Sequence, residues 1–470
     1  MNLHLALLLG YSALLIGMGL WLGRRVEGSG DFFVAGRRLG PGLLFSTLLA
    51  ANIGAGSTVN AAGLGFRDGL SAWWWVGSAG IGSLVLAFTL GPRIRQLAAA
   101  HDLRTVGDFL EWRYHRGVRG LTAALLWLGT LAILAGQLIA GSRVLEAVAG
   151  IDKTTGCLIG GVVMTTYFAA GGLLGSAWVN LVQLVVLLGG LALALPLVLV
   201  RAGGPSAIAE ATPAGDGYWS LLAGGESGIV YLAMLMPAFI VSPGLLQKIY
   251  GARDDRAVRL GVAANGVVLL VFAFVPVLFG IAARALHPDL PSRELALPTL
   301  LVEDVPLLVG SLGLAAVFSA EVSSADAILF MLATSLSQDL YKRFLDPGAS
   351  DERVLRVARL AAVLGGACGV GIALLAETIY QVLSIFYTLL SVSLFVPLVA
   401  GVYLRRCGTP EASAGILAGV SAVAAARLWP DAGWVTPALQ GLAASVAAAA
   451  AVGLLRKLAS RRDVTRGGGA

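Results

Sequence analysis

Long apolar runs, separated by short polar segments, make up most of this chain. Each run is close to the roughly 20 residues that a helix needs to cross the hydrocarbon core of a bilayer. The runs neither alternate apolar and polar residues nor have the length of barrel strands, so helices are expected. The pattern predicts an all-α membrane protein with about 13 transmembrane helices, at residues 3–22, 41–66, 71–92, 120–148, 155–171, 175–200, 227–247, 260–286, 306–338, 357–376, 379–404, 409–426 and 434–455.

Charged residues between the runs predict how the chain is oriented. Of the 33 Lys and Arg residues, 26 lie in alternate loops and in the tail after residue 455, and only 7 lie on the opposite side. Basic loops mark the cytoplasmic side of a membrane protein. The N-terminus is therefore predicted outside and the C-terminus in the cytoplasm, in the inner membrane of a bacterial cell. Because the basic residues are spread over these loops, the net charge of +6 does not indicate a nucleic-acid partner.

Composition agrees with a chain that faces lipid. Hydrophobic residues make up 57% of it and charged residues 13%, whereas soluble domains carry about 25% charge. Cys157, Cys368 and Cys407 are not spaced like a metal site or a disulfide framework, and the four histidines lie in loops or near the N-terminus. No enzyme, no bound cofactor other than an ion and no obligate protein partner is inferred.

Two of the predicted helices carry a break near their middle. Residues 50–58 read Ala-Ala-Asn-Ile-Gly-Ala-Gly-Ser-Thr, and residues 242–244 read Ser-Pro-Gly. Glycine weakens a helix, and proline removes a backbone donor. The breaks lie five spans apart, so the units that begin there have opposite orientation, as in inverted-repeat transporters. An alternative is that the glycines only allow helices to pack closely.

This repeat predicts a division of the chain into five parts. They are an extra helix and loop at 1–40, a first repeat at 41–201, an external loop at 202–226, a second repeat at 227–404, and two helices with a tail at 405–470.

The ninth run carries two carboxylates and two adjacent hydroxyls. Glu321 and Asp326 lie where insertion of a charge costs roughly 2.5–3.5 kcal/mol, so both are expected to face the bundle interior or water. Ala320, Ser323 and Ser324 lie on one helix face. A carbonyl and two hydroxyls on one face suit a hard cation such as sodium. The alternative is that the serines bond to their own i−4 carbonyls.

Several segments together resemble the sodium:solute symporter family. The matching motifs lie at residues 31–37, 50–53, 167–183, 242–254 and 323–344, and the resemblance extends over about residues 10–405. It implies the five-plus-five inverted-repeat fold of the amino-acid transporter LeuT, with one helix before the repeats and two after. It also implies a secondary-active symporter that imports a small polar solute, driven by Na+ moving inward.

The resemblance implies a sodium site as well. Its ligands would be the carbonyls of Ala50, Ile53 and Ala320 and the hydroxyls of Ser323 and Ser324.

The chain departs from the family at a second site. Many members have an aspartate where this chain has Asn180, and hydroxyls where it has Asp326 and Ala327. We therefore consider a modified cation or proton site formed by Asp326 and Asn180, with Glu321 as a further candidate. The alternative is a protonated Asp326 that is hydrogen-bonded inside the bundle.

Polar and aromatic residues near the breaks are the candidates for binding the solute. They are Asn52, Gly54, Ser57, Asn60, Trp75, Gln137, Ser242 and Tyr387. Exposed backbone near Gly54 would suit a carboxylate, whereas the two buried acids would suit an amine, so amino acids, carboxylates and amines all stay open. A sugar is less favoured, because serines stand where the sugar-transporting branch has glutamine and asparagine. A proton-coupled transporter using Asp326 or Glu321 is the main alternative, and a membrane sensor is disfavoured because the tail is short.

Overall fold

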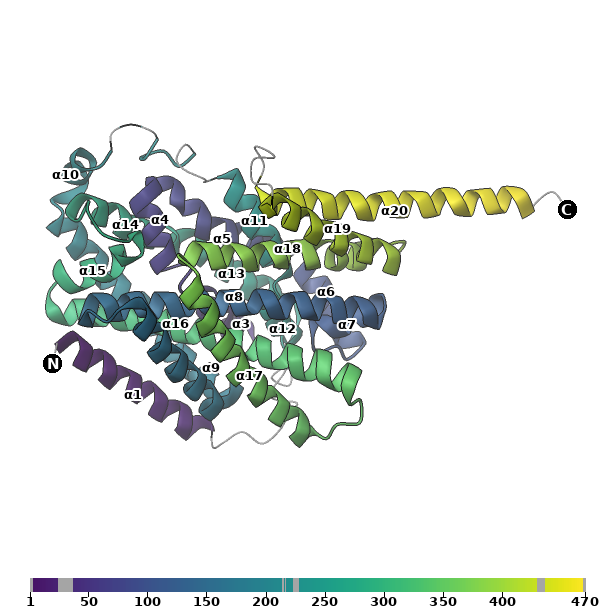
Figure 1. Ribbon diagram of the computed structural model, residues 1–470, viewed down its shortest axis with the longest axis horizontal. Coiled ribbons are helices and arrows are strands. Elements are labelled where there is room, and N and C mark those ends of the chain that lie inside the picture. Colours follow the sequence, from purple (N-terminus) through teal and green to yellow (C-terminus); the bar gives the residue numbers. More distant parts are fainter. Residues whose placement is uncertain are drawn as a thin grey trace.

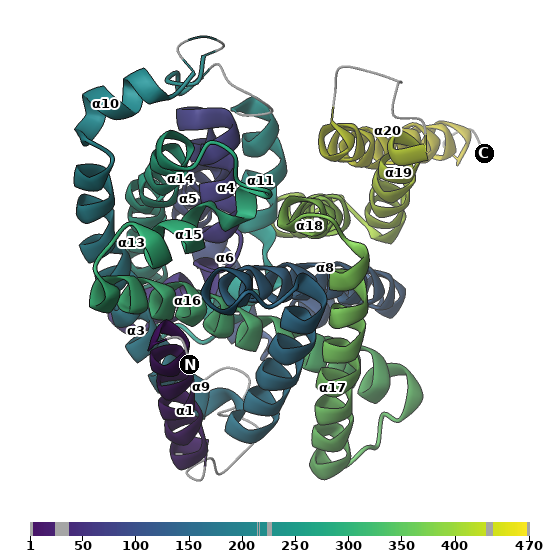
Figure 2. The same cartoon turned by 60° about the vertical axis from the view of Figure 1, so that its left-hand side comes forward.

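The computed structural model describes residues 3–23, 37–213, 215, 217–222, 228–428 and 436–467, and it is a bundle of helices (Figures 1 and 2). In chain order the helices are α1 (Leu3–Gly23), α3 (Pro41–Asn52), α4 (Val59–Asp68), η2 (Gly69–Ala72), α5 (Trp73–Phe88), α6 (Leu90–Ala100), α7 (Val106–Arg113), α8 (Arg116–Ala149), α9 (Lys153–Arg201), α10 (Gly204–Ala211), α11 (Ile229–Val241), α12 (Pro243–Tyr250), α13 (Asp255–Phe272), α14 (Phe274–Leu286), η3 (Arg293–Leu295), α15 (Ala296–Glu303), α16 (Leu307–Thr334), η4 (Ser335–Leu345), α17 (Asp351–Leu375), α18 (Ile379–Tyr403), α19 (Thr409–Leu428) and α20 (Pro437–Gly467).

The described residues confirm the prediction of an all-α membrane protein. Ten helical stretches in them are long and apolar enough to cross a bilayer, and two shorter apolar helices lie at Leu3–Leu15 and Pro41–Asn52. The number of thirteen spans stays a prediction. Regular β-strands are not found in this part of the chain, where Leu39 and Ala252 form an isolated bridge.

One predicted boundary is not found. Two spans were expected at 155–171 and 175–200, but the structure has a single helix of 49 residues, α9. Glycine lowers helix propensity by about 1 kcal/mol without removing a hydrogen bond, so Gly171 and Gly172 do not end the helix as a proline would.

Both predicted breaks are present. The first broken helix ends at Asn52 and resumes at Val59 as α4, and residues 53–58 form bends and turns between the two pieces. The second ends at Val241 and resumes at Pro243 as α12. Proline is tolerated at the start of a helix, where its missing N–H would have no partner in any case. Short-range chemistry alone therefore locates these two interruptions.

The two broken helices run in opposite directions. Leu39 lies just before α3 and pairs with the backbone just after α12: its N–H donates to the Gly251 carbonyl, and its carbonyl accepts from the Arg253 N–H, both at 3.0 Å. The start of α3 and the end of α12 therefore lie at the same end of the bundle. This placement agrees with an inverted repeat, while the five predicted domain boundaries stay predictions.

The same end gathers the segments that were predicted to share one side of the membrane. Arg95 contacts Asp255 at 2.5 Å, and Arg37 contacts Asp102 at 2.8 Å. We call this region, formed by residues 37–40, 93–119, 251–259, 335–346 and 401–408, the basic end.

The other helices pack around the two broken helices. In the interior, α5 packs on α11 and α13, and α4 packs on α14. The first helix, α1, lies against α9 and α16, while α19 and α20 pack on each other and on α18. Figure 1 shows α20 reaching well beyond the other helices at its C-terminal end. The interruptions at 53–58 and 242 are thus enclosed by intact helices.

Candidate sodium site and central cavity

Two adjacent serine hydroxyls of α16 contact backbone carbonyls where the first broken helix meets α16. The Ser323 hydroxyl donates to the carbonyls of Ala50 at 3.1 Å and Ala320 at 3.2 Å, and the Ser324 hydroxyl donates to the carbonyl of Ile53 at 3.2 Å. These distances exceed the usual 2.7–2.8 Å of an O–H···O hydrogen bond. The structure therefore brings together all five residues of the predicted sodium site, and long hydrogen bonds join its two serine hydroxyls to its three carbonyls.

Glycine at position 54 is what allows this close approach. A Cβ atom there would lie 2.3 Å from the Ser324 hydroxyl oxygen and 3.1 Å from the side-chain oxygen of Gln137. That same Gln137 oxygen accepts a hydrogen bond from the Ala55 N–H at 3.0 Å. The interruption leaves the Ile53 carbonyl available, and α8 and α16 then hold the unwound segment from two sides.

The donor set fits a hard monovalent cation. All five atoms are uncharged carbonyl or hydroxyl oxygens, which are the ligand type that hard cations prefer. A divalent ion is normally bound by carboxylates as well, and none of the five residues supplies one. The residues present therefore fit sodium.

The predicted solute-binding residues line one cavity, which we call the central cavity. It has about 870 Å³ of space between its lining atoms, part of which is open to solvent. Seven of the eight candidates line it, namely Asn52, Gly54, Ser57, Trp75, Gln137, Ser242 and Tyr387. Asn60, further along α4, is not among the described lining residues, and its place in the solute site stays a prediction. The sodium-site residue Ser324 lines the cavity too.

Of the three consecutive tryptophans, Trp75 is the one that lines the central cavity. Its ring lies 6.0 Å from that of Tyr387 and 5.3 Å from that of Tyr231, in edge-to-face arrangements. Trp73 and Trp74 instead donate their indole N–H groups to the backbone carbonyls of Leu270 and Leu221. An aromatic wall thus stands at one side of the cavity.

Three features of the cavity were missed from the sequence. Phe239 stacks on Tyr387 with ring centres 5.8 Å apart, and Lys248 is the one charged residue of the described lining. Asn265 binds the side chain of Asn52 at 3.2 Å from the middle of α13. The sequence held a signal for two of these residues. Asn265 is an asparagine within an apolar run, and Lys248 is a lysine one turn after the Ser-Pro-Gly break, and both patterns indicate a buried polar contact.

The two buried acids lie away from the cavity. Glu321 and Asp326 are both buried on α16, and neither lines the central cavity. A Cβ added at Gly141 would lie 3.3 Å from a Glu321 carboxylate oxygen, which places this acid against α8. The side chain of Asn180 lies outside the described residues, so its pairing with Asp326 stays a prediction. The cavity lining therefore does not support a solute amine bound directly by Glu321 or Asp326.

Around this site, the fold defines a membrane transporter with two oppositely directed broken helices. The chain belongs to the sodium:solute symporter family, whose model matches residues 32–419. It is 28% identical over 440 residues to the sodium/pantothenate symporter of Escherichia coli, a match that covers 88% of each chain. It is 26% identical over 446 residues to the human sodium/iodide cotransporter, covering 88% of this chain and 67% of that one. The predicted family is confirmed, and its members are sodium-coupled transporters of small solutes.

A solved structure supports the same fold. The substrate-bound, outward-open Na+-coupled sialic acid symporter superposes with a TM-score of 0.79 at 20% identity, covering 96% of this chain and 98% of that one. The transporter Mhp1 in a closed conformation gives a TM-score of 0.56 at 15% identity. The LeuT-like fold expected from the resemblance is thus confirmed.

Proposed function

We propose that this protein is a secondary-active symporter that imports a small polar solute together with Na+ moving inward, and that it has no enzymatic activity. The meeting of the Ser323 and Ser324 hydroxyls with the carbonyls freed by the first helix break carries this proposal. Sodium would bind there through lone pairs of the three carbonyl and two hydroxyl oxygens, with the serine hydroxyls keeping their protons and turning them away from the ion.

Coupling between ion and solute follows from the shared segment at residues 53–57. Ile53 supplies a carbonyl to the sodium site, while Gly54 and Ser57 line the central cavity. Two ligands are coupled when each favours the same state of the protein. An ion that orders this segment also orders the wall against which the solute binds.

The lining of the central cavity favours an anionic or neutral polar solute over an amine. No carboxylate lies in its described lining, whereas the Lys248 side chain does. The Lys248 amino group donates to the Thr47 carbonyl at 2.5 Å and, charged or neutral, has a further N–H to donate to a solute. Trp75, Phe239 and Tyr387 would cover an apolar part of the same solute.

The orientation of the chain is part of the proposal. The basic end carries 15 of the 33 Lys and Arg residues, whereas the loops predicted on the opposite side carry 7. The basic end therefore faces the cytoplasm of a bacterial cell, with the N-terminus outside and the C-terminus inside.

Thermal unfolding of the purified protein in NaCl and in KCl tests the sodium site. Bound ligand raises apparent stability by mass action, so Na+ is expected to raise the melting temperature and K+ to have much less effect. Ser323→Ala should raise the sodium concentration that gives half of this effect at least tenfold, because one ligand is lost. Ser319→Ala is the matched control: this serine lies one turn away and donates to the Ala315 carbonyl. Equal sodium responses of the two variants would refute the site.

A proton-coupled transporter is the second candidate, because Glu321 and Asp326 are both buried on α16. Solute uptake into proteoliposomes, with and without Na+ at one fixed pH, separates the two. Uptake that needs a proton gradient and ignores sodium would favour the proton.

A further inference from the structure

A second cavity lies between the central cavity and the basic end. It has about 560 Å³ of space between its lining atoms, part of which is open to solvent, and α7, α8, α12 and the α16–η4 segment form its walls. Its polar lining includes Thr122 and Thr334, whose hydroxyls are buried and have no hydrogen-bond partner among the described residues. A polar chamber of this kind accommodates water or a polar molecule. We call it the inner cavity.

One methionine separates the two cavities. Met331 lines both of them, and a Cβ added at Gly244 on α12 would lie 3.3 Å from its sulfur. The Met331 side chain therefore reaches from α16 to the start of α12. Because methionine has three rotatable bonds, it can change shape without a large rearrangement of its neighbours.

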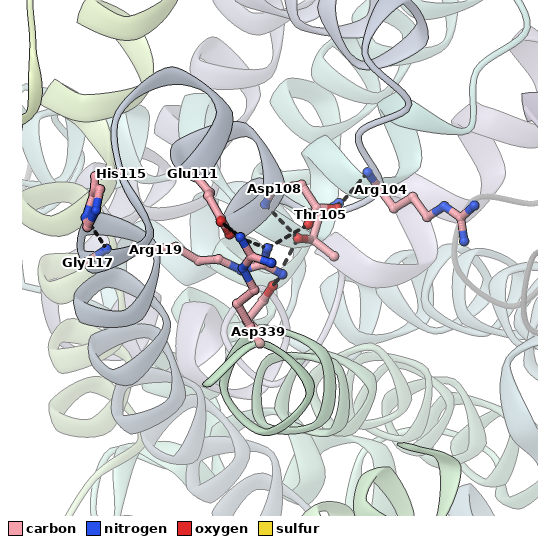
Figure 3. Close-up of polar contacts among 9 residues, drawn as sticks. Arg104, Thr105, Asp108, Glu111, His115, Gly117, Arg119 and Asp339 are labelled. Carbon is pink, nitrogen blue, oxygen red and sulfur yellow. Dashed lines mark hydrogen bonds and ion pairs between the residues drawn. The ribbon is translucent and has the colours of Figure 1, made fainter. Parts of the chain in front are cut away.

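Arg119 and Asp339, which both line the inner cavity, belong to an ion cluster at the basic end (Figure 3). Arg119 on α8 contacts Asp339 on η4 at 2.6 Å, and Asp108 and Glu111 on α7 at 3.0 Å each. The Thr105 hydroxyl also donates to Asp339, at 3.1 Å. The side chains of Arg119 and Asp339 are only 8% and 11% exposed, so this pair is shielded from solvent.

The cluster joins elements that must separate if the inner cavity is to open. Asp339 belongs to η4, a π-helical segment, while its partners belong to α7 and α8. A fourth tie runs from Arg343 on η4 to Glu111. Helices of the π type are rare and frequently mark functional sites. Both ion pairs thus hold η4 against α7 and α8 at the mouth of the cavity.

We propose that the inner cavity is the vestibule through which solute and ion leave the central cavity toward the cytoplasm, and that the Arg119 cluster is the latch that keeps it shut. This inference rests on the proposed function, because only a transporter needs such an exit. Release then requires Met331 to swing aside and the contact between Arg119 and Asp339 to break. The segment η4 would then be the part of the protein that moves when the inner cavity opens.

Cysteine labelling measures how often the latch opens. Ala123 lines the inner cavity and is buried, so Ala123→Cys, in a background with Cys157, Cys368 and Cys407 replaced by alanine, serves as the reporter. A membrane-impermeant maleimide is added to inside-out and to right-side-out vesicles. Labelling is expected from the basic end alone.

The latch variant is Asp339→Asn, which keeps the shape of the side chain and removes its charge. It should speed labelling at least tenfold, a shift of about 1.4 kcal/mol in the balance between closed and open forms. Glu111→Gln breaks the outer ties to Arg119 and Arg343 and should give a smaller increase, which also tests the latch if Asp339→Asn does not fold. Arg353→Gln is the control, because its pair with Asp346 at 3.5 Å lies on the exposed surface.

The outcomes separate the latch from the proposed function. Faster labelling in both latch variants, with no change in the control, supports the inference. Unchanged labelling in both variants, or labelling only from the opposite face, overturns it. Sodium-dependent melting is measured on the same proteins: if Na+ stabilises all of them while labelling is unchanged, the latch alone fails, whereas a parent protein indifferent to Na+ contradicts the proposed function.

Discussion

Replacing Gly54 by alanine should damage the sodium site although it replaces none of the proposed ligands. The new Cβ would lie 2.3 Å from the Ser324 hydroxyl oxygen and 2.7 Å from the Ser324 Cβ, closer than such atoms can approach. Either Ser324 or the unwound segment must therefore move. Overpacking of this kind costs about 1–3 kcal/mol. If that cost falls on the ion-bound form, the half-saturating sodium concentration rises about 5- to 150-fold.

The assay is thermal unfolding over a range of NaCl concentrations, with Gly42→Ala as the control. Gly42 lies in the same helix with nothing within 4 Å of an added Cβ, so its alanine variant should keep the normal sodium response. A double variant, Gly54→Ala with Ser324→Ala, adds a second check. Ser324→Ala removes the atom nearest to the new Cβ, so Gly54→Ala should weaken sodium binding less in this background. The effects of the two substitutions on the half-saturating sodium concentration should therefore not add. An unaltered sodium response in Gly54→Ala would refute this account of the site.

Two further predictions concern groups around the site. Gln137→Leu removes the acceptor of the Ala55 N–H and leaves a buried donor unpaired, which should cost about 1–3 kcal/mol and lower the melting temperature; an unchanged melting curve would contradict this role. Asp326→Asn should alter the charge moved per solute, or the pH dependence of uptake, if this carboxyl belongs to a second cation or proton site; normal values of both in proteoliposome currents would eliminate that site.

The features that could be predicted from the sequence were those set by nearby residues. Gly54 and Pro243 interrupt their helices through their own backbone chemistry, so both breaks could be located without a structure. The spacing of Ala320, Ser323 and Ser324 likewise places them on one helix face whatever surrounds it. Local rules of this kind located the face of Ala320, Ser323 and Ser324 and the residues near the breaks, whereas the Ala50 and Ile53 carbonyls were implied by the family resemblance.

Contacts between distant segments could not be predicted in this way. Arg119 and Asp339 are 220 positions apart, and nothing in either segment names the other as its partner. The same holds for Asn52 and Asn265, which meet only because α13 packs beside α3. The continuity of α9 through Gly171 and Gly172 was missed for a different reason, since glycine weakens a helix without forcing it to end.

The pairing of Leu39 with the chain around Ala252 ties the outermost ends of the two broken helices through main-chain atoms only. Ordinary side-chain substitutions leave such a tie intact, so these positions are free to diverge among related proteins while the mechanical connection persists. A proline at Leu39 or Arg253 would be the exception, because it abolishes a donor. Apart from that case, the two main-chain hydrogen bonds hold the start of α3 beside the end of α12 whatever side chains stand at these positions.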